Sequence, residues 1–248
     1  MKMIGIIAGL ILSWLLLWLV QKQSILALGF TPVGVRSLQF ILGFSFSSIA
    51  CASSQLTEAA MLHAHWQLNP NIDFAHILEY FRWNFNSVMF EELLFRGALL
   101  YIAIKRLGQV KGVLFSAVCF GIYHWFSYGV FGSIVPMIFV FLITALMGWV
   151  WAYAFAKTKS MALPIGFHLG WNFTFNAIFS KGFISYPVLI LVKAADNTGL
   201  DGLASLANML MQNLFPSILT FVFIKFCFKE RMSSRLVVAE EKNKEPVH

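Results

Sequence analysis

Charged side chains are scarce in this chain of 248 residues, and the shortage excludes an ordinary soluble domain. Only 12% of the residues are charged, against roughly 25% in soluble domains, while 59% are hydrophobic and the mean hydropathy is +0.75. Because backbone polar groups must be satisfied within each segment in lipid, we expect helices rather than a sheet. The predicted fold class is therefore all-α, a polytopic transmembrane helical bundle of about seven to eight helices.

Long apolar runs can each supply the ~20 helical residues that a bilayer needs. They cover residues 3–20, 38–57, 74–104, 112–128, 133–156, 161–180 and 203–228. A further run, 183–192, is too short for a span, and we interpret it as re-entrant or interfacial. Residues 3–20 have a second interpretation, the apolar region of a signal peptide, although the run is long for one.

Cysteine is also rare. Cys51, Cys119 and Cys227 each lie within or at the end of an apolar run without paired spacing, which argues against a disulfide framework or a zinc ribbon. Internal repeats are absent as well. We therefore predict a single integral-membrane domain over residues 1–228, with a motif core at 74–180, followed by a polar tail at 229–248.

The formal net charge of +7 does not indicate a nucleic-acid partner, because the basic residues are scattered between apolar runs and in the tail. Positive-inside anchoring explains them, and it makes the lipid bilayer the first expected partner. The basic residues fall in alternate loops, which we place in the cytoplasm: Lys22 and Arg36, then Lys105, Arg106 and Lys111, then Lys157 and Lys159. Acidic residues surround an intervening loop: Glu58, Asp73 and Glu79.

Two adjacent carboxylates, Glu91 and Glu92, interrupt the run 74–104, and Arg96 follows one helical turn later. An ionisable side chain at mid-bilayer costs about 2.5 to 3.5 kcal/mol, so this group needs partners or a water-filled pocket. Residues four apart share a helix face, which predicts an ion pair between Glu92 and Arg96 and turns Glu91 about 100° away. One carboxylate is then free for chemistry. The structural alternative is that both hold neighbouring helices together through buried hydrogen bonds.

Two histidines add polar groups to later runs. His124 ends the segment FGIYH, and His168 is followed at i+4 by Asn172 on the same helical face. A lone histidine in an apolar helix is commonly only an interhelical hydrogen-bonding group. At 1.5 Å per residue, however, Glu91 and these three residues all lie about 14 to 21 Å from a basic loop on the same side. The four side chains can therefore occupy one layer near mid-membrane.

The segments EELLFR at 91–96, FGIYH at 120–124 and HLGWN at 168–172 resemble motifs of the CAAX protease and bacteriocin-processing (CPBP) family, also labelled Abi proteins. That family is related to type II CAAX prenyl endopeptidases, and its motifs EExxxR, FxxxH and HxxxN occur here in the same order. The resemblance covers about residues 74–180 and implies an intramembrane protease of glutamic type. It implies these roles: water activation by Glu91 and His124, oxyanion stabilisation by His168 and Asn172, and support by Glu92 and Arg96.

The residue types suit that chemistry. Hydrolysis without a covalent intermediate needs a base for water and donors that face the tetrahedral oxyanion. No serine or cysteine stands beside a matching base in these segments, so a covalent nucleophile is not favoured. The predicted function is an intramembrane endopeptidase without a cofactor, in a bacterial plasma membrane. Its expected substrate is a membrane-associated peptide or small protein such as a bacteriocin precursor, with or without a lipid group.

Three alternatives stay open. Glu91, His124 and His168 form a set of two histidines and one carboxylate that can hold Zn²⁺, although no H-E-x-x-H motif supports a metalloprotease. An intramembrane polar cluster is also typical of transporters, but the chain shows no paired half-helices in repeated positions. The third alternative is a non-catalytic immunity or scaffolding protein, since some members of the family are associated with bacteriocin self-protection.

Overall fold

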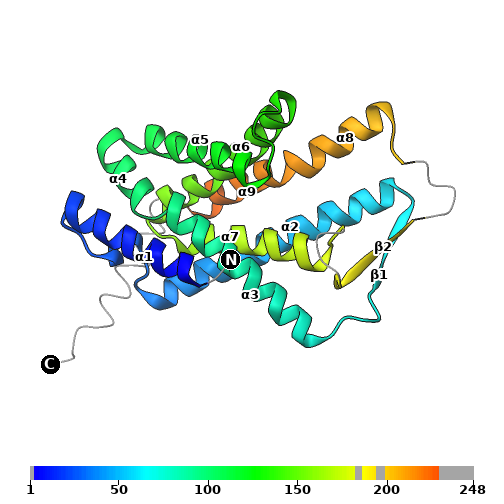
Figure 1. The fold of residues 1–248 in the computed structure, drawn as a ribbon, viewed down its shortest axis with the longest axis horizontal. Coiled ribbons are helices and arrows are strands. Elements are labelled where there is room, and N and C mark those ends of the chain that lie inside the picture. The colour runs from blue at the N-terminus through cyan, green and yellow to red at the C-terminus, as the bar shows by residue number, and fades with distance from the viewer. Residues whose placement is uncertain (1–2, 182–185, 194–198, 229–248) are drawn as a thin grey trace.

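The computed structural model describes residues 3–181, 186–193 and 199–228, which are mostly helical (Figure 1). The helices are α1 (Ile4–Leu16) with a π-helical turn (Leu17–Gln21), a short 3-10 helix (Ile25–Leu28), α2 (Val33–Met61), α3 (Phe74–Phe95), α4 (Ala98–Leu107), α5 (Gln109–Ser127), α6 (Ile134–Thr158), α7 (Ala162–Phe173) with a π-helical turn (Thr174–Ile178), α8 (Gly202–Asn213) and α9 (Phe215–Cys227). Strands β1 (Ala64–Leu68) and β2 (Leu189–Lys193) pair antiparallel. The predicted helical class is confirmed, with this small sheet added. The predicted tail, 229–248, lies outside the described residues.

Five helical stretches in the described ranges are long and apolar enough to cross a membrane. They are Ile4–Gln21, Ile25–Met61, Gln109–Ser127, Ile134–Thr158 and Gly202–Cys227. Each coincides with one of the predicted apolar runs. The helices that carry Glu91 and His168, α3 and α7, are not among the five. The predicted count of about seven to eight spans is therefore not confirmed.

The run 74–104 is not one helix, contrary to the prediction. α3 ends just before Arg96, and α4 begins just after Gly97. The chain bends tightly there, because a Cβ on Gly97 would lie 2.2 Å from the carbonyl oxygen of Leu93. The distance between Glu91 and the basic loop at Lys105 was calculated for one straight helix. It therefore does not hold in the structure, where the two residues lie on different helices.

Two other apolar runs also differ from the prediction. The run 203–228 divides, because α8 ends at Asn213 and Pro216 lies in the first turn of α9, where a proline is tolerated. The run 183–192 was interpreted as a re-entrant or interfacial segment, without a strand. In its described part, residues 189–192 belong to strand β2. A short apolar run is compatible with either a strand or a helix. Here the segment is a strand because it pairs with β1.

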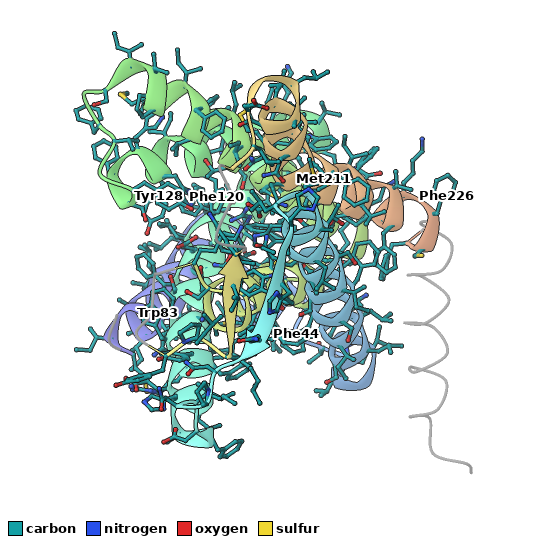
Figure 2. The ribbon with its side chains drawn as sticks, turned by 90° about the vertical axis from the view of Figure 1, so that its right-hand side faces the viewer. Phe44, Trp83, Phe120, Tyr128, Met211 and Phe226 are labelled. Carbon is teal, nitrogen blue, oxygen red and sulfur yellow. The ribbon has the colours of Figure 1, made fainter. Side chains whose placement is uncertain are left out.

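α7 lies against α2 more closely than larger side chains would allow. A Cβ on Gly166 would lie 2.4 Å from the carbonyl oxygen of Phe40, and one on Gly170 would lie 2.3 Å from that of Phe44. Small residues four apart bring helix backbones together in this way. Figure 2 labels Phe44 on α2, beside the ribbon of α7. Because both glycines face α2, the side chain of His168 between them is directed to the helices on the other side, α3 and α6.

The first and third basic loops contact each other. The Met161 N–H donates to the Leu28 carbonyl at 3.0 Å, and Arg36 donates to the Thr158 carbonyl at 3.1 Å. α5 and α7 run in the same direction across the molecule, whereas α3 runs against them from the end that carries the β-strands (Figure 1). Residues one turn after His124 and one turn after His168 therefore lie on the same side of the two imidazoles.

Candidate active site

Glu91 lies where α3, α5 and α7 meet. The residue is 7% exposed. The Oε2 atom of Glu91 lies 4.0 Å from Nε2 of His124 and 3.7 Å from Nε2 of His168, while Oε1 accepts a long hydrogen bond of 3.5 Å from the Ser87 hydroxyl. The structure therefore brings together three residues that lie far apart in the sequence, around one carboxylate.

Glu92 faces a different set of partners. Its Oε1 atom lies 3.2 Å from Nη1 of Arg96 and 2.8 Å from Nδ1 of His168, and both members of the ion pair are fully buried. The predicted ion pair between Glu92 and Arg96 is thereby confirmed. The Arg96 guanidinium also lies over the ring of Phe120, 4.1 Å from its centroid, and 5.2 Å from the ring of Trp151. These rings replace part of the solvation that burial removes from the cation.

The two imidazoles present the same nitrogen to Glu91. The Nδ1 atom of His124 lies 2.8 Å from the carbonyl oxygen of Phe120, which can only accept a hydrogen bond, so this nitrogen carries the hydrogen. The Nδ1 atom of His168 donates in the same way to Glu92, whose negative charge Arg96 stabilises. In the neutral imidazoles both Nε2 atoms are therefore acceptors that face the free carboxylate.

Packing fixes the orientation of each ring. His168 is stacked on Trp151, with 4.0 Å between ring centroids and 22° between planes. The imidazole of His124 lies edge-on to the rings of Phe120 and Tyr128, with ring centroids 4.4 and 5.2 Å apart respectively. Figure 2 labels Phe120 and Tyr128 next to each other, on α5 and just after its end. With their Nδ1 atoms hydrogen-bonded and their faces covered, the imidazoles have little freedom to turn away from Glu91.

Asn172 lies one turn beyond His168 on α7 and is partly buried. Its carboxamide makes no hydrogen bond to another residue within the described part of the chain, so its N–H groups are available to a bound molecule. A π-helical turn, Thr174–Ile178, begins two residues later. Such turns often occur at functional sites because they change the direction in which neighbouring side chains point.

Glu91 is close to both imidazoles without bonding to either. Separations of 3.7 and 4.0 Å are too long for direct hydrogen bonds, and each is a separation that a water molecule can bridge. A carboxylate that shares a water with an imidazole is a candidate general base. Oε1 of Glu92 is already engaged by Arg96 and by Nδ1 of His168, so this oxygen is not available to a molecule bound at Glu91.

The same residues have donor types that suit zinc. The hydrogen bond from each Nδ1 to an oxygen acceptor is the arrangement that zinc-ligating histidines commonly show. Ligands about 2.0 to 2.1 Å from a tetrahedral zinc lie roughly 3.4 Å apart, which is shorter than the separations measured here. Among the described residues, no group of three or more His, Cys, Asp and Glu side chains is arranged to hold a metal ion. The donor set fits the metal in kind but not in spacing.

Three residues near the site were not predicted from sequence: Ser87, Trp151 and Tyr128. Ser87 precedes Glu91 by one helical turn, and Tyr128 follows His124 by one turn, so helical spacing offers a signal for both. Trp151 lies on α6, outside every motif, and its stacking on His168 arises only from tertiary packing.

Comparison with known protein families agrees with this geometry. A family model described as type II CAAX prenyl endopeptidase Rce1-like matches residues 74–174. The match begins at the first residue of α3 and includes Glu91, His124, His168 and Asn172. No curated protein and no solved structure matches the chain.

Proposed function

Because a type II CAAX prenyl endopeptidase Rce1-like family model matches residues 74–174, we propose that this integral membrane protein is an intramembrane endopeptidase whose hydrolytic water is activated by Glu91 and His124. The family supports a peptidase with a peptide substrate, and the apolar helices support a membrane setting. We place the enzyme in a bacterial plasma membrane. We count seven spans by adding α3 and α7 to the five long apolar helices.

One observation supports the proposal: within the described residues Glu91 has no ion-pair partner of fixed charge, and its Oε2 atom lies within 4.0 Å of Nε2 of both His124 and His168. The neighbouring carboxylate is committed to Arg96. A base needs an oxygen that is free to take a proton, and a buried ion pair does not provide one. The difference between two consecutive residues therefore supports the assignment of the base to Glu91.

The reaction follows from these positions. Glu91 takes a proton from the water while the water oxygen attacks the carbonyl carbon of the peptide bond, and the carbonyl oxygen becomes a tetrahedral oxyanion. Asn172 donates an N–H to that oxygen, and His168 donates from Nε2 when it is an imidazolium. The carbon–nitrogen bond then breaks as the leaving amine receives a proton from Glu91 or through His124. One water is consumed, and a carboxylate and an amine are released.

The substrate we propose is a membrane-associated peptide or a small-protein precursor, such as a bacteriocin precursor. Two internally quenched peptides of the same sequence separate the possibilities for lipidation. One ends in a farnesylated Cys-aliphatic-aliphatic-X sequence, and the other carries the same sequence without the lipid. Equal kcat/KM for both would remove prenyl recognition from the proposal and leave peptide hydrolysis.

Glu91→Gln tests the assignment of the base. We expect cleavage of the quenched peptides by the detergent-solubilised protein to fall at least ~10³-fold, because the amide cannot accept the water proton. Glu79→Gln is the matched control, since Glu79 is an exposed residue of the same helix and should leave the rate unchanged. If Glu91→Gln keeps wild-type cleavage, Glu91 is not the base; if the protein cleaves neither peptide, a non-catalytic immunity or transport role replaces this proposal.

The zinc-dependent alternative uses the same residues and is favoured by the two Nε2 acceptors that face Glu91. There Glu91, His124 and His168 would hold the metal, which would supply Lewis-acid polarisation of a water. Treatment of the active protein with 1,10-phenanthroline separates the two. We expect the rate to be unchanged, whereas a loss that added Zn²⁺ restores would establish the metalloprotease.

A further inference from the structure

The proposed active site has more acceptors than donors toward the reacting atoms. Glu91 accepts, and each neutral imidazole accepts at Nε2, because its hydrogen lies on Nδ1. His168 donates to an oxyanion only in its imidazolium form. Asn172 is then the one permanent donor among the four residues to which the resemblance assigns a catalytic role, since Arg96 is paired with Glu92. Oxyanion sites usually hold the oxygen with more than one donor, so a second permanent donor is expected nearby.

Tyr128 stands in the same relation to His124 as Asn172 does to His168. Each lies four residues after a site histidine, and α5 and α7 run in the same direction (Figure 1). Each side chain therefore lies about 6 Å beyond its imidazole, on the same side of the site. The ring of Tyr128 packs against the imidazole of His124, with 5.2 Å between the ring centroids.

The Tyr128 side chain is accessible to a bound molecule. Tyr128 is 61% exposed, and its ring packs against His124. The ordinary pKa of a tyrosine phenol is about 10, so the hydroxyl is protonated near neutral pH and can donate a hydrogen bond.

We propose that the Tyr128 hydroxyl is a second oxyanion donor, which holds the carbonyl oxygen of the substrate together with Asn172. This inference rests on the proposed endopeptidase function. No proton leaves the phenol during the reaction. The O–H bond is oriented toward the carbonyl oxygen and strengthens its hydrogen bond as negative charge develops on that oxygen. Tyr128 is thereby a catalytic residue that the sequence motifs do not contain.

Tyr128→Phe tests the inference, because it removes only the hydroxyl and keeps the ring against His124. On the quenched peptides we expect kcat to fall about 100-fold with KM changed less than about threefold, since the lost bond is strongest in the transition state. Tyr123→Phe is the matched control: its ring is also 5.2 Å from His124, but it lies on another face of α5. We expect that variant to keep the wild-type kcat.

The outcomes separate this inference from the function on which it rests. If the wild-type protein cleaves a peptide, Glu91→Gln abolishes cleavage and Tyr128→Phe retains the full kcat, the endopeptidase stands and the donor role of Tyr128 is overturned. Equal losses in Tyr128→Phe and Tyr123→Phe overturn it too, because both rings flank His124 and only one is assigned a donor. A wild-type protein that cleaves neither peptide overturns both proposals. Unchanged thermal unfolding of Tyr128→Phe in detergent shows that a loss of kcat is not a loss of fold.

Discussion

Replacement of Glu92 by Gln should destabilise the protein, because it leaves the guanidinium of Arg96 buried without a counter-ion. Both side chains are fully buried, and within the described residues the Arg96 side chain donates one further hydrogen bond, a long one of 3.4 Å to the Gly148 carbonyl. Removing one partner of a buried ion pair costs about 3 to 5 kcal/mol. We expect the lower end, about 3 kcal/mol, because the rings of Phe120 and Trp151 still attract the cation.

The measurement is reversible unfolding of the purified protein in mixed micelles, read by tryptophan fluorescence. Glu79→Gln, an exposed change on the same helix, should stay within about 0.5 kcal/mol of the wild type. The double variant Glu92→Gln, Arg96→Met should recover most of the loss, because it removes the uncompensated charge together with its partner. A single variant as stable as Glu79→Gln, or a double variant no better than Glu92→Gln alone, would refute the reasoning.

Three further predictions follow from single contacts. Gly97→Ala should destabilise the fold by about 1 to 3 kcal/mol, since its Cβ would lie 2.2 Å from a carbonyl oxygen of α3; an unfolding midpoint equal to that of the wild type would contradict this. Trp151→Leu should lower kcat/KM by up to about tenfold, because an aromatic stack on His168 contributes about 0.5 to 1.5 kcal/mol, and steady-state cleavage rates measure it. The hydrogen bond from the His76 backbone N–H lowers the pKa of the Asp73 carboxyl. Its contribution to the stability of the fold is therefore present above the ordinary Asp pKa and is lost as the pH falls through the lowered pKa. Asp73→Asn should accordingly reduce the loss of unfolding free energy on acidification, measured as a series of unfolding curves at falling pH.

The parts of the site that could be predicted from sequence are those that depend on one helix at a time. The ion pair of Glu92 with Arg96 follows from a spacing of four residues, and it is present. The hydrogen bond from His168 to Glu92 joins residues 76 positions apart, and no local pattern specifies it. The bend at Gly97 was also missed, because hydropathy is continuous across it and only the approach to the Leu93 carbonyl requires a glycine.

The sheet and the aromatic packing escaped prediction for the same reason. β2 is apolar and short, and its partner β1 lies more than a hundred residues earlier in the chain. Trp151 looks like any other apolar residue of α6 until the fold places it on His168. Sequence spacing selected the residues that we propose carry the chemistry, whereas tertiary contacts determine which nitrogen of each imidazole faces the carboxylate.

Two consecutive glutamates in one helix cannot have the same environment, and here that difference separates stability from chemistry. The turn of about 100° per residue directs Glu92 to Arg96 and to Nδ1 of His168, and it directs Glu91 to the two Nε2 atoms. Glu92 thereby fixes the hydrogen on His168, which decides that the nitrogen facing Glu91 is an acceptor when the ring is neutral. Glu91→Gln should therefore remove activity and keep the fold, because the ion pair stays intact. Glu92→Gln should lower both the activity and the stability of the fold. The amide does not neutralise the charge of Arg96, and it accepts a weaker hydrogen bond from Nδ1 of His168 than the carboxylate does.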